Sequence, residues 1–84
     1  MKNIIITGTS RGIGYELALQ FANAGHQVVA ISRNMPTKLI ENPNITCLSI
    51  DISNSTELNQ ISQFVTNSWQ NKVDILINNA GILI

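Results

Sequence analysis

The stretch TGTSRGIG, residues 7–14, places three glycines and several small polar residues directly after a run of isoleucines. A strand that ends in a glycine turn and leads into a helix presents backbone N–H groups at the positive end of the helix dipole, where anions bind. Gly8 would permit the sharp turn, Gly12 would let the backbone approach a pyrophosphate, and Gly14 would let the helix pack closely on the strand. The stretch therefore predicts a phosphate-binding loop; the alternative is a purely structural glycine turn.

Four apolar segments are predicted to form the strands that position this loop. Runs of β-branched residues without alternation are typical of strands that are buried on both faces. The predicted strands are residues 3–7, 27–32, 45–50 and 73–77. The connection at 34–44 holds both prolines, which leaves room for no more than two helical turns.

Two segments, 13–24 and 55–70, have apolar residues at helical spacing. Gly25 is suited to end the first helix. Asn54 followed by Glu57 predicts a capping box at the start of the second. The residues expected to be buried are Ile13, Leu17, Phe21, Ala22 and Ala24 in the first helix, and Leu58, Ile61, Phe64, Val65 and Trp69 in the second.

The alternation of strands and helices predicts an α/β fold, a doubly wound parallel sheet with helices on both faces. Right-handed crossovers give the strand order 3-2-1-4, with the switch point between the first and fourth strands. Ligands of such sheets bind outside the carboxyl ends of the strands at that point. The glycine stretch lies there, and so does NNAG at residues 78–81.

Three short motifs follow three of the predicted strands. TGTSRGIG follows the first, Asp51 follows the third, and NNAG follows the fourth. In these motifs and their order the chain resembles the short-chain dehydrogenase/reductase family, over all 84 residues and with a short connection between the second and third strands. The resemblance implies an NAD(P)-dependent oxidoreductase with a Rossmann-type domain. Residues 1–84 would be the N-terminal part of that domain, truncated after NNAG.

The resemblance also implies which residues contact the cofactor. Asp51 would accept a hydrogen bond from the adenine amino group, with Ile52 beside the ring. The residues expected to line the pyrophosphate and adenosine ribose are Gly8, Thr9, Ser10, Arg11, Gly12, Ile13 and Gly14, and those expected to approach the cofactor's ribose are Asn79, Ala80 and Gly81. Asn78 is expected to tie the fourth strand to its neighbours. The alternatives are that Asp51 merely ends a strand and that the two asparagines merely form a turn.

The end of the second predicted strand bears on the choice of cofactor. Enzymes that prefer NAD usually hold the ribose 2′-OH there with an acidic residue, whereas this chain has Ser32 followed by Arg33. Arg11 of the glycine stretch would lie close by, and two guanidinium groups suit a 2′-phosphate because each offers paired donors. The prediction is NADP(H) rather than NAD(H). The alternative is two solvated surface arginines.

The chemistry implied by the resemblance is hydride transfer between nicotinamide and a small carbonyl or alcohol substrate. The family uses a tyrosine, a lysine four residues later, a serine and a further asparagine. The only tyrosine, Tyr15, has Leu19 in the lysine position and is assigned no catalytic role. His26 is expected in a loop, and no metal-ligand spacing occurs. The chain is expected to be the cofactor-binding part of a longer enzyme; the alternatives are a truncated, non-catalytic nucleotide-binding or interaction module and a purely structural domain.

Composition excludes some partners. Five Lys and Arg balance five Asp and Glu, so charge gives no reason to expect binding to nucleic acid or to an anionic membrane. Cys47 is the single cysteine and is expected to be a reduced, buried thiol. The apolar run near the N-terminus is too short for a signal peptide, so a cytoplasmic location is expected. The apolar fourth strand would be an open sheet edge, which predicts self-association.

Overall fold

The isoleucines of β1 (Asn3–Thr7) lie in the middle of a parallel sheet of four strands, in the order β3-β2-β1-β4. The computed structural model describes residues 1–79. β1 pairs with β2 (Gln27–Ser32) on one side and with β4 (Ile75–Asn78) on the other, and β3 (Ile45–Ser49) pairs with β2. The predicted strand order is confirmed, and with it the switch point between β1 and β4.

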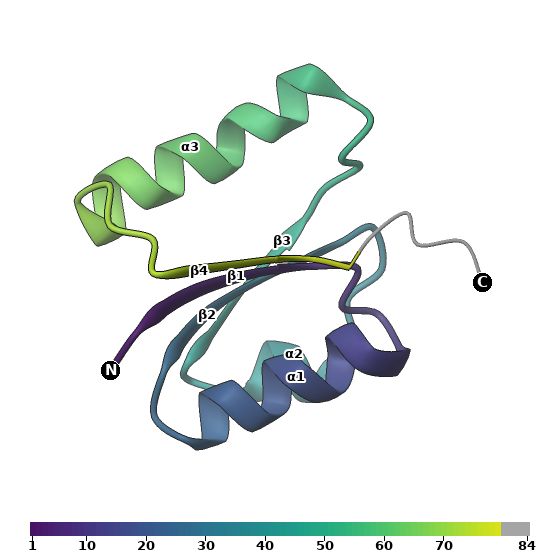
Figure 1. Ribbon diagram of the computed structural model, residues 1–84. Helices are drawn as coiled ribbons and strands as arrows, with labels where there is room; N and C mark the ends of the chain where they lie inside the picture. The colour runs from purple at the N-terminus through teal and green to yellow at the C-terminus, as the bar shows by residue number, and fades with distance from the viewer. Residues whose placement is uncertain (80–84) are drawn as a thin grey trace.

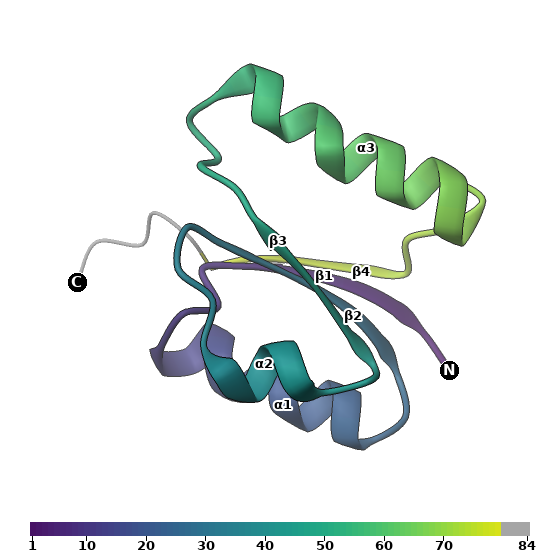
Figure 2. The same ribbon diagram turned by 180° about the vertical axis from the view of Figure 1, so that it is seen from behind.

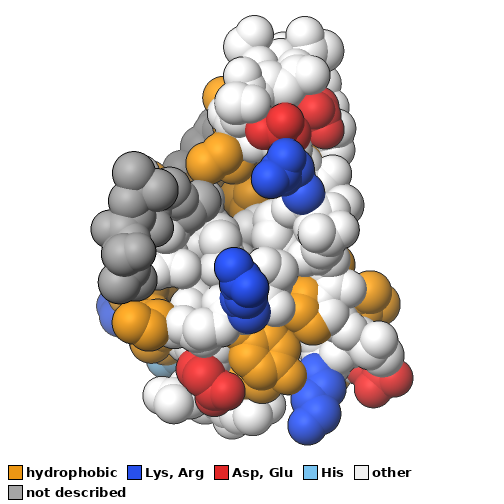
Figure 3. Space-filling model, turned by 90° about the vertical axis from the view of Figure 1, so that its right-hand side faces the viewer, with side chains coloured by type: hydrophobic (Ala, Val, Ile, Leu, Met, Phe, Trp, Pro, Cys, Tyr) orange, Lys and Arg blue, Asp and Glu red, His pale blue; other side chains and the backbone are white. Residues whose placement is uncertain are grey.

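Helices cover both faces of this sheet (Figures 1 and 2). α1 (Gly12–Asn23) and the short α2 (Thr37–Glu41) lie on one face, and α3 (Ser55–Trp69) lies on the other. This is the doubly wound, Rossmann-type arrangement that the sequence predicts. The carboxyl edge of the sheet, where the strands lead into α1 and α3, faces the viewer in Figure 3.

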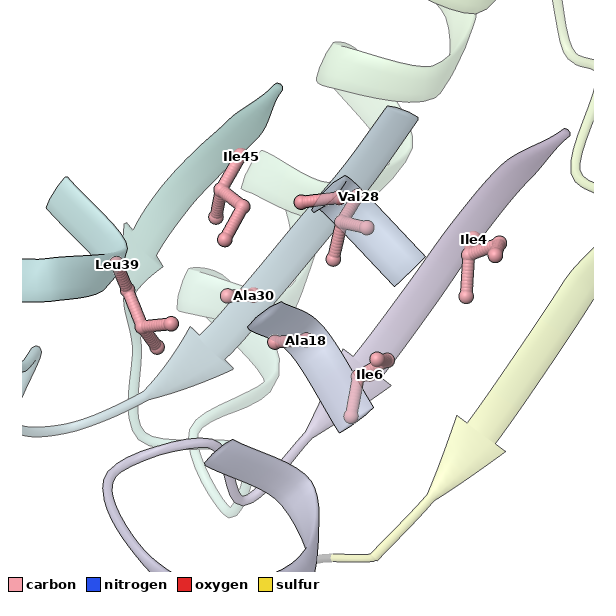
Figure 4. Packing of buried hydrophobic residues seen from close by; sticks show 8 residues of the cluster. Ile4, Ile6, Ala18, Val28, Ala30, Leu39 and Ile45 are labelled. Carbon is pink, nitrogen blue, oxygen red and sulfur yellow. The ribbon is translucent and has the colours of Figure 1, made fainter. Parts of the chain in front are cut away.

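The core beneath α1 is built from small helical residues against large strand residues (Figure 4). α1 buries Gly14, Ala18 and Ala22, which recur every fourth residue and let the helix approach the sheet closely. Ile13 was expected on this buried face, but its side chain is 68% exposed, so that prediction is wrong. The buried members of the core are Ile4, Ile6, Ala18, Ala22, Val28, Ala30, Leu39 and Ile45.

The rest of the predicted α1 face is only partly covered. Leu17 and Phe21 are half-buried at the margin of the core, and Ala24 is exposed because it follows the last residue of the helix. Cys47 is a free, half-buried thiol beside the same core rather than a fully buried one. Partial burial raises the pKa of the Cys47 thiol.

The face beneath α3 has a smaller core, made of Ile5, Val29, Ile31, Ile50 and Trp69. Trp69 is the buried residue of α3, and its ring meets that of Phe64 edge to face at a centroid distance of 5.3 Å. Leu58 was expected to be buried but is 38% exposed. Leu58 lies near the N-terminal end of α3, which is inclined away from the sheet (Figures 1 and 2).

The capping box predicted for α3 forms only in part. The Asn54 side chain accepts hydrogen bonds from the N–H groups of Thr56 and Glu57, as an N-cap should. The Glu57 carboxylate, however, accepts the N–H of Asp51, and the N–H of Asn54 is bonded to the Asp51 carbonyl. The first turn of α3 is therefore joined to the residue that follows β3.

β4 begins at Ile75, two residues later than predicted, because Asp74 holds the preceding turn. The Asp74 carboxylate accepts the N–H of Asn3 at 2.8 Å, and the Asn3 amide donates to the carbonyl of Lys72 at 2.9 Å. The hydrogen bond from Asn3 lowers the pKa of Asp74. In the described part of the chain, no helix is long and apolar enough to cross a membrane.

Candidate functional site

The glycine loop joins β1 to α1 in a backbone conformation that favours glycine. Gly8 and Gly12 have φ values of 71° and 68°, in the left-handed region where a Cβ is unfavourable. The N–H of Gly8 donates to the carbonyl of Ile31 at 2.8 Å, so the turn begins against the end of β2. Gly8 therefore has the turn conformation that the sequence predicts, and Gly12 has a backbone conformation that also favours glycine.

Gly14 has a different role, which is to let α1 approach β1. A Cβ at this position would lie 2.7 Å from the Asn79 side-chain nitrogen and would overlap the carbonyl oxygen of Gly8. A Cβ atom does not lie this close to a non-bonded heavy atom without strain, and the carbonyl belongs to the backbone, which cannot rotate away. The predicted close packing of helix on strand is confirmed.

Thr9 is the residue of the loop that faces inward. Its side chain is 0% exposed, and its hydroxyl donates to the Ile31 carbonyl at 3.3 Å. Thr9 was expected to line the cofactor, but its side chain is turned inward and holds the loop to β2 instead. A small hydroxyl residue fits this place because it can satisfy a buried carbonyl within a tight turn.

In the part of the chain that the structure describes, the N-cap residue of α1 supplies no side-chain cap. Arg11 occupies the N-cap position with extended backbone, its side chain makes no capping hydrogen bond, and the first turn contains no acidic residue. The leading N–H groups of a helix have no partner within the helix itself. Ser10, Arg11, Gly12 and Ile13 are all exposed around them. This end of α1 is suited to receive an anion.

Beside the glycine loop, a groove of about 420 Å³ crosses the carboxyl edge of the sheet. A second hollow, of about 390 Å³, shares Ser10 and Arg33 with it. Basic and acidic side chains gather on this edge (Figure 3). The groove is lined by Gly8, Ser10, Ser32, Arg33, Ile50, Asp51, Ile52 and Ser53, and the hollow by Ser10, Arg11, Arg33 and Asn34.

Seven of the fourteen predicted site residues line these two depressions, although they come from distant parts of the sequence. Arg11 and Arg33 line the same hollow, as expected for a shared ligand. The sequence analysis missed Asn34, Ile50 and Ser53. Ser53 could have been found from its position two residues after an aspartate, which is typical of an Asx turn.

Asp51 is held by the turn that follows it. Its Oδ1 accepts hydrogen bonds from the Ser53 hydroxyl at 2.7 Å and from the Ser53 N–H at 3.0 Å. These bonds, with a smaller contribution from the charge of Arg33, lower the pKa of Asp51. The carboxylate is therefore an ionised acceptor at neutral pH, on the wall of the groove.

Arg33 is exposed, but the backbone that carries it is fixed. The Ser49 hydroxyl donates to the Arg33 carbonyl at 2.7 Å, and the N–H of Ile50 donates to the Ser32 carbonyl at 3.1 Å. The hydroxyl of Ser32 is turned onto the Asn34 carbonyl. The end of β2 thus places a cation beside the groove and offers no acidic side chain there.

The asparagines that follow β4 bind to the protein itself. Thr7 donates its hydroxyl to Asn78 Oδ1 at 3.0 Å, so Asn78 ties β4 to β1 as predicted. The Asn79 N–H donates to Thr7 Oγ1 at 3.0 Å, and its side-chain amide donates to the Gly8 carbonyl at 3.1 Å. Asn79, expected at the cofactor's ribose, thus holds the glycine loop. Ala80 and Gly81 lie outside the described residues.

Residues without an assigned role lie away from the groove. Tyr15 packs at the margin of the α1 core, and His26 accepts the N–H of Lys2 on Nδ1 at 3.0 Å while its ring meets Phe21 edge to face. Within residues 1–79, no three His, Cys, Asp or Glu side chains are grouped so as to hold a metal ion.

Known proteins share this sequence pattern and fold. A family model described as short chain dehydrogenase matches residues 2–84. A Drosophila melanogaster dehydrogenase/reductase SDR family protein 7-like is 38% identical over 93 residues, which cover 96% of this chain and 28% of the fly protein. The present chain therefore spans less than a third of that relative.

Solved structures give the same result. A short-chain dehydrogenase from Leptospira borgpetersenii with bound NAD⁺ has a TM-score of 0.83 and 30% identity, over 99% of this chain and 32% of that one. A structure of ElxO with NADP bound has a TM-score of 0.78 and 30% identity, over 100% of this chain and 37% of that one. With its glycine loop, its strand order and these matches, the chain belongs to the short-chain dehydrogenase/reductase family of oxidoreductases.

Proposed function

We propose that this chain is the cofactor-binding part of an NADP(H)-dependent short-chain dehydrogenase/reductase. The uncapped start of α1 and the glycine loop would hold the pyrophosphate, and the groove along Asp51 and Ile52 would hold the adenine. The loop can accommodate a pyrophosphate because Gly12 has no side chain, and the position that its Cβ would take is open space. When bound, nicotinamide supplies hydride chemistry toward a carbonyl or alcohol.

The preference for NADP(H) rests on two observations. Arg11 and Arg33 line a single hollow, and the end of β2 has no acidic residue. A 2′-phosphate in this hollow would accept paired, charge-assisted hydrogen bonds from guanidinium groups. An enzyme that uses NAD would instead need an acceptor for the 2′-OH. Because relatives with NAD⁺ and with NADP bound both exist, the choice depends on these residues of the chain itself.

The test is Arg33→Asp, with binding of NADPH and NADH measured by titration calorimetry. We expect the affinity for NADPH to fall by about 10-fold or more, since a charge-assisted bond is lost and a carboxylate is placed beside the phosphate. Binding of NADH should be retained or improved. Lys38→Asp, the same charge change on α2, is the control. An unchanged NADPH/NADH ratio in Arg33→Asp would overturn the preference.

The catalytic groups of the family are proposed to lie in a longer protein, because this chain spans about a third of its relatives. Reading the coding frame beyond Ile84 for a serine followed by Tyr-x-x-x-Lys tests this directly. The alternative is a non-catalytic nucleotide-binding module. Such a module would bind NADPH to saturation and reduce no carbonyl compound. The cytoplasmic location and the self-association stay predictions.

A further inference from the structure

We propose that Ser53 is a positioning residue, which holds the Asp51 carboxylate in the orientation that recognises the amino group of adenine and thereby sets the base specificity of the groove. The inference rests on the proposed function, because it requires a dinucleotide along the groove wall. Ser53 lines the same groove as Asp51 and Ile52.

The contacts of the Asp51 side chain carry the proposal. Both donors of Ser53, its hydroxyl at 2.7 Å and its N–H at 3.0 Å, converge on Oδ1 of Asp51. Two donors on one oxygen restrict the side-chain rotation of the aspartate, as in an Asx turn. Oδ2 accepts no hydrogen bond from the residues that the structure describes, so it can accept an N–H from a ligand.

The backbone of Asp51 is held from the other side by α3. Its carbonyl accepts the N–H of Asn54 at 3.0 Å, and its N–H donates to Glu57 Oε1 at 3.5 Å. These bonds do not involve the Ser53 hydroxyl. Ser53 is exposed and contributes nothing to either core, so removal of its hydroxyl should leave the fold intact and release only the carboxylate.

The recognition chemistry is selective because an ionised carboxylate only accepts hydrogen bonds. Adenine presents a donor, the amino group on C6, whereas hypoxanthine presents a carbonyl at the same place, which a carboxylate repels. A carboxylate with a fixed orientation discriminates between these bases. One that rotates freely can turn away from the carbonyl, and so loses most of the discrimination.

The experiment measures the affinities for NADPH and for its hypoxanthine counterpart by calorimetry. We expect wild-type protein to prefer NADPH by about 10-fold, because each mispaired polar group costs roughly that much. Ser53→Ala should weaken NADPH binding by about 5-fold and bring the ratio close to 1. Ser53→Thr keeps the hydroxyl and should keep the wild-type ratio. Ser55→Ala makes the same chemical change two residues away and should also keep it.

The pH profile adds a readout that a merely structural role would not move. The charged groups near the Asp51 carboxylate are Arg33 from the end of β2 and Glu57 from α3. The hydrogen bond from the Ser53 hydroxyl is the largest cause of the lowered Asp51 pKa, so the pKa of Asp51 should rise in Ser53→Ala. NADPH affinity falls on acidification when Asp51 is protonated, and this fall, the acid limb of the binding profile, should therefore occur at higher pH in the variant. Glu57→Gln removes the other carboxylate near Asp51, so it shows how much of the pH dependence of NADPH binding comes from Glu57.

The outcomes separate this inference from the proposed function. Wild-type protein that binds neither NADPH nor NADH would refute both. Retained NADPH binding with a wild-type base ratio and an unmoved acid limb in Ser53→Ala would refute the role of Ser53 alone. A lost preference that Ser53→Thr restores supports it.

Discussion

α1 and α3 both begin at the carboxyl edge of the sheet, but their first turns differ. The start of α1 has Arg11 at the N-cap, no capping side chain and no acidic residue. At the start of α3, the Asn54 side chain accepts two N–H groups, and Glu57 adds an acidic residue in the first turn. The capped start stabilises the protein by satisfying its own donors. The uncapped start leaves its donors available, as the proposed anion site requires.

The third residue of each helix shows the same division. In α1 it is Gly14, which has no side chain and lies against the Gly8 carbonyl. In α3 it is Glu57, whose long side chain reaches back to the Asp51 N–H. Gly14 serves close packing under the glycine loop, and Glu57 holds the wall of the groove to its helix.

The largest expected effect is that of Gly14→Ala. The new Cβ would overlap the Gly8 carbonyl, so the loop or the helix must move, and we expect the free energy of unfolding to fall by about 2–3 kcal/mol in urea titrations. Gly→Ala inside a helix ordinarily stabilises by about 1 kcal/mol. A gain in stability would therefore show that α1 does not depend on this close approach.

A second prediction makes the start of α1 resemble that of α3. Arg11→Asn introduces a capping side chain at a residue whose extended backbone already suits an N-cap. We expect the free energy of unfolding to rise by about 0.5–1 kcal/mol, because the new side chain satisfies N–H groups at the start of α1. The affinity for NADPH should fall about 10-fold, because the cap competes with the phosphate and the guanidinium group is lost. Arg11→Ala is the control and should lower affinity without the gain in stability. If stability and NADPH affinity both rose or both fell in Arg11→Asn, the contrast drawn between the starts of α1 and α3 would be wrong.

The reverse change removes the cap of α3. Asn54→Ala should lower the free energy of unfolding by about 1 kcal/mol, the usual cost of losing an N-cap, in the same urea titrations. Asn54→Asp keeps the acceptor and should keep most of the stability. NADPH affinity should change less than in Arg11→Asn, because the Asn54 N–H still bonds the Asp51 carbonyl. A larger loss of affinity than of stability would mean that α3 takes part in binding.

The smallest effect is expected on acidification. The pKa of Asp51 is lowered in the folded protein, so its contribution to stability is present above the ordinary aspartate pKa of about 3.9. That contribution is lost as the pH falls through the lowered pKa. The first turn of α1 has no carboxylate. Amide hydrogen exchange at residues 54–57 should therefore lose protection at acid pH before exchange in the hydrogen-bonded part of α1, residues 16–23, does; the opposite order would contradict this assignment.

The errors of the sequence analysis have a common physical origin. Ile13 and Leu58 were assigned to buried faces from periodicity, but both lie in first turns, where the next segment of chain decides what is covered. Thr9 was expected to line the ligand because of the family resemblance, yet its hydroxyl is turned inward and donates to a buried carbonyl at the end of β2. Periodicity describes the middle of a helix better than its ends.

The local pattern by itself determined the strands, their parallel order and the loop that leaves α1 uncapped, because β-branched runs, right-handed crossovers and glycine conformation depend on near neighbours and on chirality. Only the tertiary structure decided that Ser53 holds Asp51 in a groove beside Gly8 and Ser10. It also decided that the Asn79 amide holds Gly8. Those contacts join the ends of different strands, and their distances are set by how the sheet twists and how closely each helix packs on it.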